Sequence, residues 1–191
     1  MSCSTFATVS SRRVPHEDTA LLVVDVQEDF CPGGALAVTG GDAVVPVINA
    51  WMKRFQTVVA SRDWHPADSI HFRHWPPHCV AGTPGAEFRR GLATQRFSLV
   101  VDKGTGNADD GYSAFEATST DLAHWLADRG IRTLYVCGLA TDYCVRRTVL
   151  DALARGFTVY VIRAGVAPVD VNPGDGERAL EEMTGAGARL V

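Results

Sequence analysis

Short apolar runs recur along the chain, and amphipathic stretches separate them. The first run, residues 20–26, is apolar except for Asp25, as expected of a strand that is buried on both faces of a sheet. Similar runs follow at residues 57–61, 99–101, 133–137, 158–162 and 189–191. The pattern therefore predicts six strands, of which the last, at residues 189–191, is short.

Helical periodicity fills the intervals between these runs. Apolar side chains share one stripe in residues 44–55, where Pro46 is tolerated in the first turn, and another around residues 122–126. Further helices are expected over about residues 142–155 and around residues 179–183. This alternation predicts a three-layer α/β/α fold of the Rossmann-like kind, with a central, mostly parallel, six-stranded sheet.

Length and charge narrow the class of protein. A chain of 191 residues suits one domain, and we expect an extended or poorly ordered lead over residues 1–19 and a single domain over residues 20–191. The formal net charge of −4 argues against a nucleic-acid partner or an anionic membrane surface. No apolar run is long enough for a membrane span, and the N-terminus lacks the apolar core of a secretory signal.

The cysteine pattern indicates the compartment. The chain has five cysteines, an odd number, and no CxxC pair. Such a set does not resemble a disulfide framework. We therefore expect a reducing cytoplasm, in which one thiol can be chemically active.

Two long irregular stretches, residues 62–91 and 102–112, each follow a predicted strand. Long loops in a compact domain are usually functional, and ligands of parallel sheets bind beyond the carboxyl ends of the strands. Polar residues lie at or just after four of these ends: Asp25, Asp63, Lys103 and Cys144. We expect the chemistry of the protein at this edge of the sheet.

Cys144 lies between a predicted strand and a predicted helix. A thiol near a helix N-terminus gains from the helix dipole and from backbone N–H groups, and both favour the thiolate. With Asp25 as proton acceptor and Lys103 to balance charge, it would form a nucleophilic cluster. The alternative is a buried cysteine that fills the core beside a structural ion pair.

Asp63 and His65 are two positions apart, so on an extended backbone they project to the same side. The loop after them supplies His71, His74 and His78. A carboxylate with imidazoles suits zinc, iron or manganese. The alternative is a solvated loop that happens to be rich in histidine.

Several segments together resemble the isochorismatase-like cysteine hydrolases, and more narrowly their nicotinamidase (pyrazinamidase) branch. The resemblance covers the chain from about residue 20 to its end, and the segment DWH followed by WPPHCVAGTPGAEF is its most specific part. The matching segments are residues 25–30 (DVQEDF), 63–66 (DWHP), 75–80 (WPPHCV), 82–88 (GTPGAEF), 103–104 (KG) and 140–145 (ATDYCV). The resemblance implies a metal-dependent amidase that converts nicotinamide, and also pyrazinamide, to the acid and ammonia through a thioester.

The same resemblance implies a role for each catalytic residue. Cys144 would be the nucleophile, Asp25 the general base and Lys103 the charge-stabilising partner. The bond between Leu139 and Ala140 would be cis, and the N–H groups of Ala140 and Cys144 would face the oxyanion.

The resemblance also implies the ligands. Asp63, His65 and His78 would hold one divalent metal, most often zinc and in some members iron or manganese, and His71 matches a position that is a ligand in only some members. Three aromatic side chains match or could replace the walls around a pyridine ring: Phe30, Trp75 and Tyr112. Members of the family are often dimers or larger, which leaves a homo-oligomer open.

Two other functions remain open from the sequence. The first is a related cysteine hydrolase that acts on another small amide, an N-carbamoyl compound or an isochorismate-type vinyl ether; many such relatives lack the aspartate and histidine ligands. The second is a non-catalytic metal-binding or scaffold protein, in which Cys144 would be inert toward alkylation.

Overall fold

The computed structural model of the protein describes residues 17–107 and 111–191. Its centre is a six-stranded sheet in which every pair of neighbouring strands is parallel, in the order β3-β2-β1-β4-β5-β6. The strands are β1 (Thr19–Val24), β2 (Thr57–Asp63), β3 (Leu99–Lys103), β4 (Thr133–Leu139), β5 (Thr158–Ala167) and β6 (Arg189–Leu190). All six predicted strands are confirmed.

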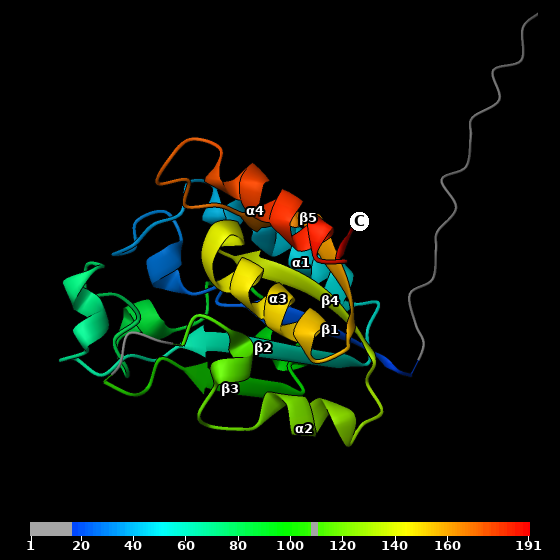
Figure 1. The fold of residues 1–191 in the computed structure, drawn as a ribbon. Helices are drawn as coiled ribbons and strands as arrows, with labels where there is room; N and C mark the ends of the chain where they lie inside the picture. Colours follow the sequence, from blue (N-terminus) through cyan, green and yellow to red (C-terminus); the bar gives the residue numbers. More distant parts are fainter. Residues whose placement is uncertain (1–16, 108–110) are drawn as a thin grey trace, which may run out of the picture.

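Helices cover both faces of this sheet, which confirms the three-layer fold. Helix α1 packs on one face, and α2, α3 and α4 pack on the other (Figure 1). The α-helices are α1 (Val44–Met52), α2 (Leu122–Ala127), α3 (Arg146–Ala154) and α4 (Asp175–Gly185). The helix predicted from about residue 142 differs at its start, because Thr141–Val145 form a π-helix before α3 begins.

Strand β1 shows why the apolar runs are nearly continuous. Leu21 and Val23 join the core beneath α1, whereas Leu22 and Val24 join the core beneath the other three helices. Every residue of β1 is buried, because the strand lies between two strands and two helical layers.

The predicted N-terminal lead falls mostly on residues 1–16, which lie outside the described residues. Thr19, which the sequence assigned to the lead, is the first residue of β1. Within the part of the chain that the structure describes, no helix combines the length and apolar character that a membrane crossing needs.

The carboxyl ends of β3, β2, β1 and β4 lie side by side, because these four strands are neighbours in the sheet. The segment between β2 and β3 extends beyond these ends, at the left of Figure 1. Asp63 ends β2 and is paired in register with Lys103, which ends β3, and Asp25 directly follows β1. The sheet therefore collects chemically active side chains from distant parts of the chain at one edge.

Candidate active site

The ammonium group of Lys103 lies at the centre of a buried polar cluster. Its Nζ is 2.8 Å from Asp25 Oδ2 and 3.4 Å from Cys144 Sγ. It also donates hydrogen bonds to the carboxylate of Asp63 and, over 2.8 Å, to the carbonyl oxygen of Gly111. The ligand atoms of Asp25, Asp63 and Cys144 all lie within 4.8 Å of one another. The predicted convergence of these residues is therefore present in the structure.

Burial and the shared ammonium set the charges in this cluster. Burial raises the pKa of Asp25 to about 6, although Lys103 acts against this shift. Burial acts on Asp63 in the same direction, but the ammonium of Lys103 and the ring of His65 together outweigh it and hold the pKa of Asp63 well below its usual range. The two carboxylates in turn overcome the effect of burial on Lys103 and raise its pKa. At neutral pH one ammonium is therefore shared between two carboxylates.

Cys144 differs from the expectation that its helix would favour a thiolate. It lies in the π-helix Thr141–Val145, and burial raises the pKa of its thiol well above the usual range, with Lys103 only partly offsetting the shift. The resting group is therefore a neutral thiol. A nucleophilic attack by this sulfur needs a proton acceptor within reach, and the nearer carboxylate oxygen of Asp25 lies within 4.8 Å of it.

Two buried polar residues that the sequence analysis did not select hold the carboxylates in place. Ser61 Oγ donates a 2.7 Å hydrogen bond to Asp25 Oδ1. The amide of Gln27 is bonded to both backbone groups of Asp63: Nε2 donates to its carbonyl and Oε1 accepts from its N–H, each over 2.8 Å. A signal was available for Gln27, since it lies next to an apolar strand within the segment DVQEDF.

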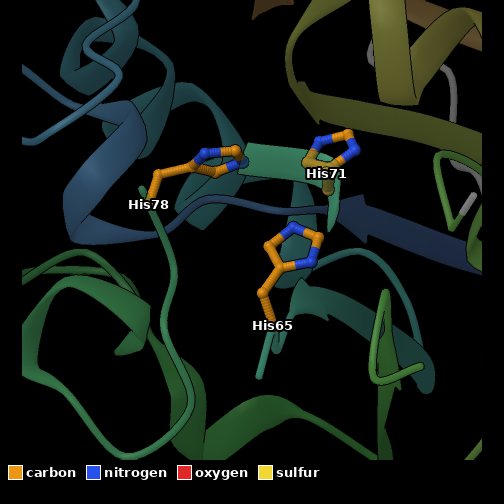
Figure 2. Close-up of side chains that lie close together, drawn as sticks. All are labelled: His65, His71 and His78. Atoms are coloured by element: carbon orange, nitrogen blue, oxygen red, sulfur yellow. The ribbon is translucent and has the colours of Figure 1, made fainter. Parts of the chain in front are cut away.

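Three histidines form a second group beside this cluster, and Figure 2 shows their rings around a common space. His65, His71 and His78 are all buried, and one ring nitrogen of each lies within 4.8 Å of the others. Nδ1 of His65 is 3.0 Å from the carbonyl oxygen of Gly104, and Nδ1 of His78 is 2.7 Å from that of Pro76. A carbonyl only accepts, so both Nδ1 atoms carry hydrogen, and in a neutral ring of this tautomer Nε2 is the nitrogen that presents a lone pair.

These lone pairs fit a divalent metal ion. His65 Nε2 is buried and has no hydrogen-bond partner among the described residues, and Asp63 Oδ2 lies 3.7 Å from it. Burial lowers the pKa of His78, which keeps its ring neutral. Neutral imidazoles that are oriented by carbonyl groups are typical ligands of zinc and similar ions. The structure thus places His71 in the group, a position that the resemblance left open, with the carboxylate of Asp63 at its border.

A cavity opens between the histidines and the sulfur of Cys144. Its walls include all three predicted aromatic residues, and also Tyr143, which the sequence analysis missed. Trp75 Nε1 donates a 3.2 Å hydrogen bond to the hydroxyl of Tyr112, and the Trp75 ring meets Tyr143 edge to face. The lining residues are Phe30, Leu36, Asp63, His65, His71, Trp75, His78, Gly111, Tyr112, Ala140, Tyr143, Cys144 and Val169. Such a space suits a flat aromatic ligand.

The peptide bond between Leu139 and Ala140 is cis in the structure. Ala140 lines the cavity together with Cys144. Asp25 and Lys103, in contrast, are fully buried behind the sulfur. The cavity therefore presents the sulfur to a ligand while the charged groups that act on it stay out of solvent.

Comparison with known proteins defines the class to which this fold and site belong. The isochorismatase domain matches residues 19–191, and the chain therefore belongs to the isochorismatase family. Among curated relatives, a nicotinamidase of Escherichia coli (strain K12) is 42% identical over 90% of this chain and 93% of its own length.

Solved structures give the same assignment. A pyrazinamidase of Pyrococcus horikoshii in complex with zinc is 46% identical, with a TM-score of 0.83 over 91% of this chain and 98% of that one. The PnC1 protein of L. infantum in complex with nicotinate is 37% identical, with a TM-score of 0.86 over 92% of this chain and 93% of that one. The chain is thus similar, over nearly its whole length, to the nicotinamidase and pyrazinamidase branch.

Proposed function

We propose that the protein is a metal-dependent cysteine amidase that hydrolyses nicotinamide to nicotinate and ammonia, with pyrazinamide as a further substrate. The observation that carries this proposal is the contact of Asp25, Lys103 and Cys144 beside the histidine group, at the wall of an aromatic cavity. The nicotinamidase and pyrazinamidase relatives support the choice of substrate. The proposed catalytic domain comprises residues 19–191.

The aromatic walls bind and orient the substrate. Phe30 and Trp75 pack against the two faces of the pyridine ring. Tyr112 lies at the edge of the ring, where the Tyr112 hydroxyl accepts a hydrogen bond from the indole of Trp75. Flat aromatic surfaces exclude water from the ring and fix its plane. The carboxamide is then directed toward Cys144, which lines the same cavity.

The first half of the reaction forms a thioester. Asp25 accepts the thiol proton of Cys144, the sulfur attacks the amide carbon, and the backbone N–H groups of Ala140 and Cys144 receive the oxyanion. The carbon–nitrogen bond breaks as Asp25 returns its proton to the leaving nitrogen, which departs as ammonia. Lys103 stays charged throughout and compensates the negative charge that moves between oxygen and sulfur.

The second half releases the acid. Asp25 accepts a proton from a water molecule, the water oxygen attacks the thioester carbon, and the carbon–sulfur bond breaks. The sulfur takes the proton back, so that Cys144 is again a neutral thiol and Asp25 a carboxylate. The net reaction consumes one amide and one water and gives one acid and one ammonia.

The metal site proposed here comprises His65, His71 and His78, with Asp63 at its border, and zinc is the ion we propose. When bound, this ion would supply a Lewis acid that anchors the ring nitrogen of the substrate. The zinc complex of the Pyrococcus horikoshii relative and the nitrogen-rich donor set support zinc over harder cations.

The proposal extends to partners and compartment. The partner is a small aromatic amide rather than a nucleic acid or a membrane, which the net charge of −4 also favours. We propose a cytoplasmic setting, supported by four free cysteines among the described residues: Cys31, Cys79, Cys137 and Cys144.

Release of ammonia from nicotinamide tests the proposal directly. We expect the wild-type protein to release ammonia, and a metal chelator to suppress the release. Cys144→Ala should lower the rate by at least roughly 1,000-fold, as expected when a nucleophile is removed. Cys137→Ala is the matched control, because Cys137 is buried in β4 outside the cavity, and it should retain activity.

Two results would contradict the proposal. Full activity in Cys144→Ala would exclude the thioester route. A chelator-insensitive protein that leaves nicotinamide intact but hydrolyses an N-carbamoyl compound would favour the other class of hydrolase.

A further inference from the structure

The groups around Lys103 have the composition of a second metal site. Asp25, Asp63 and Cys144 each offer one ligand atom, and these atoms lie within 4.8 Å of one another. A thiolate with two carboxylate oxygens is a donor set that zinc accepts, and sulfur is a ligand that zinc favours. The carbonyl oxygen of Gly111, which also accepts a hydrogen bond from Lys103, adds a fourth candidate ligand atom.

The ammonium of Lys103 fills the centre of this donor set. Its three hydrogens are donated to the carboxylate of Asp63, the carbonyl oxygen of Gly111 and the sulfur of Cys144, and Oδ2 of Asp25 lies 2.8 Å away in an ion pair. The sulfur accepts the longest of these hydrogen bonds, over 3.4 Å. Because this side chain is fully buried, a second cation has no place in the cluster while the ammonium is present.

Asp63 connects this cluster to the histidine site. One of its carboxylate oxygens accepts from Lys103, and the other lies 3.7 Å from His65 Nε2. A metal ion on the histidines is thus only one carboxylate away from the reactive sulfur. An ion that moved across would bind the sulfur lone pair that must attack the substrate.

We propose that Lys103 acts as a resident cation that keeps the divalent metal away from Cys144. The ammonium is paired with both carboxylates and occupies the centre of the cluster, so the sulfur stays without a metal ion and the metal stays on the histidines. This inference rests on the proposed metal site. Without the ammonium, the thiol would release its proton to solvent and form a sulfur–metal bond, with no change of oxidation state.

Cobalt(II) titration of Lys103→Met tests this inference, since methionine keeps an unbranched apolar chain without the charge. Thiolate-bound Co²⁺ gives an intense near-ultraviolet charge-transfer absorption that imidazole-bound Co²⁺ lacks. We expect wild-type protein to bind Co²⁺ without this absorption, and Lys103→Met to bind a further equivalent with it. The added substitution Cys144→Ser should abolish the absorption, and Lys53→Met, at an exposed lysine, should behave as wild type.

The outcomes separate this inference from the proposed function. A folded Lys103→Met protein, checked by circular dichroism, that gains no equivalent and no sulfur absorption would overturn the inference alone. Wild-type protein in excess Co²⁺ decides the matter if the variant does not fold. If the wild-type protein in excess Co²⁺ shows the charge-transfer absorption and Cys144→Ser removes it, the inference is overturned. If the wild-type protein shows no such absorption, the inference is supported. A wild-type protein that binds no Co²⁺ contradicts the proposed metal site as well.

Discussion

Asp25 combines features that a general base in this site requires. It is fully buried, accepts a hydrogen bond from Ser61 and lies against the ammonium of Lys103. Burial disfavours its charge, whereas the ammonium keeps the charge attainable at neutral pH. The carboxylate is therefore a stronger proton acceptor than an exposed aspartate and is still ionised when the enzyme would work.

The pKa of Asp25 predicts how activity depends on pH. Below this pKa the carboxyl is protonated and cannot accept the thiol proton of Cys144, so kcat/KM for nicotinamide should rise with pH and level off above about 6. The measurement is kcat/KM across pH 4 to 8 in buffers of constant ionic strength. A rising limb centred near the ordinary aspartate value of 3.8 would show that Asp25 is not the base.

At the level of elements, the loop that follows β3 holds a histidine ring through backbone alone. The carbonyl oxygen of Gly104 orients His65, and Gly104 has a φ of +64°. A Cβ at this position would lie 2.5 Å from His65 Cε1. Only glycine lets the loop approach the ring this closely.

Gly104→Ala should therefore damage the metal site. We expect the added methyl group to displace the His65 ring and lower metal affinity by at least about tenfold, in the range seen when groups that orient metal ligands are altered. Gly106→Ala is the matched control in the same loop, since a Cβ there meets no described residue within 4 Å. Isothermal titration with Zn²⁺ measures the affinity of each variant and of the wild-type protein. A Gly104→Ala protein that binds Zn²⁺ as tightly as Gly106→Ala would refute this account of the loop.

Gln27 joins three segments that meet at the edge of the sheet. Its side-chain amide forms hydrogen bonds with the N–H and C=O groups of Asp63 and with the carbonyl oxygen of Ala86. The side chain is fully buried. Replacement by an apolar residue would leave these backbone groups buried and unpaired. The end of β2, which carries Asp63, would then lose its fixed position.

Gln27→Leu is expected to lower the free energy of unfolding by about 3 kcal/mol, since each unpaired buried group costs roughly 1–3 kcal/mol. It should also weaken metal binding, because Asp63 borders the histidines. Asn49→Leu is the control, since Asn49 likewise accepts from Ala93 N–H and donates to the carbonyl of Gly91, outside the lining of the cavity. Chemical denaturation and Zn²⁺ titration should show both losses in the first variant and only a loss of stability in the second.

For the whole molecule, metal binding should be coupled to stability. The histidine site draws on the end of β2 and on the loop that follows it, so an ion there ties together segments that the sheet alone does not hold. An ion at 100 times its dissociation constant stabilises the folded state by about 2.7 kcal/mol. For a chain of this size, that corresponds to roughly 5–10 °C in melting temperature.

Removal of the metal should lower the melting temperature by this amount, and readdition of Zn²⁺ should restore it. Differential scanning calorimetry with and without chelator measures the shift. His65→Ala should melt at the same temperature in both conditions, whereas His74→Ala, at an exposed histidine outside the group, should respond as wild type does. A wild-type melting temperature that chelation leaves unchanged would contradict the proposed site.

The sequence by itself determined the fold and most members of the site. Continuous apolar runs are typical of buried strands, and their alternation with helical stripes predicts a parallel sheet covered on both faces, in which β3 and β6 prove to be the edges. From this topology the convergence of Asp25, Lys103 and Cys144 could be predicted before any distance was known, because parallel strands end at the same edge.

The tertiary structure decided the states of these groups. The helix dipole at Cys144 comes from its nearest neighbours in the chain, whereas burial by distant segments raises the pKa of its thiol. The position of His71 in the histidine group and the hydrogen bonds of the Gln27 side chain likewise depend on loops that the fold brings together. Desolvation and hydrogen bonding depend on distance in space, and no sequence pattern encodes that distance for segments connected only through irregular loops.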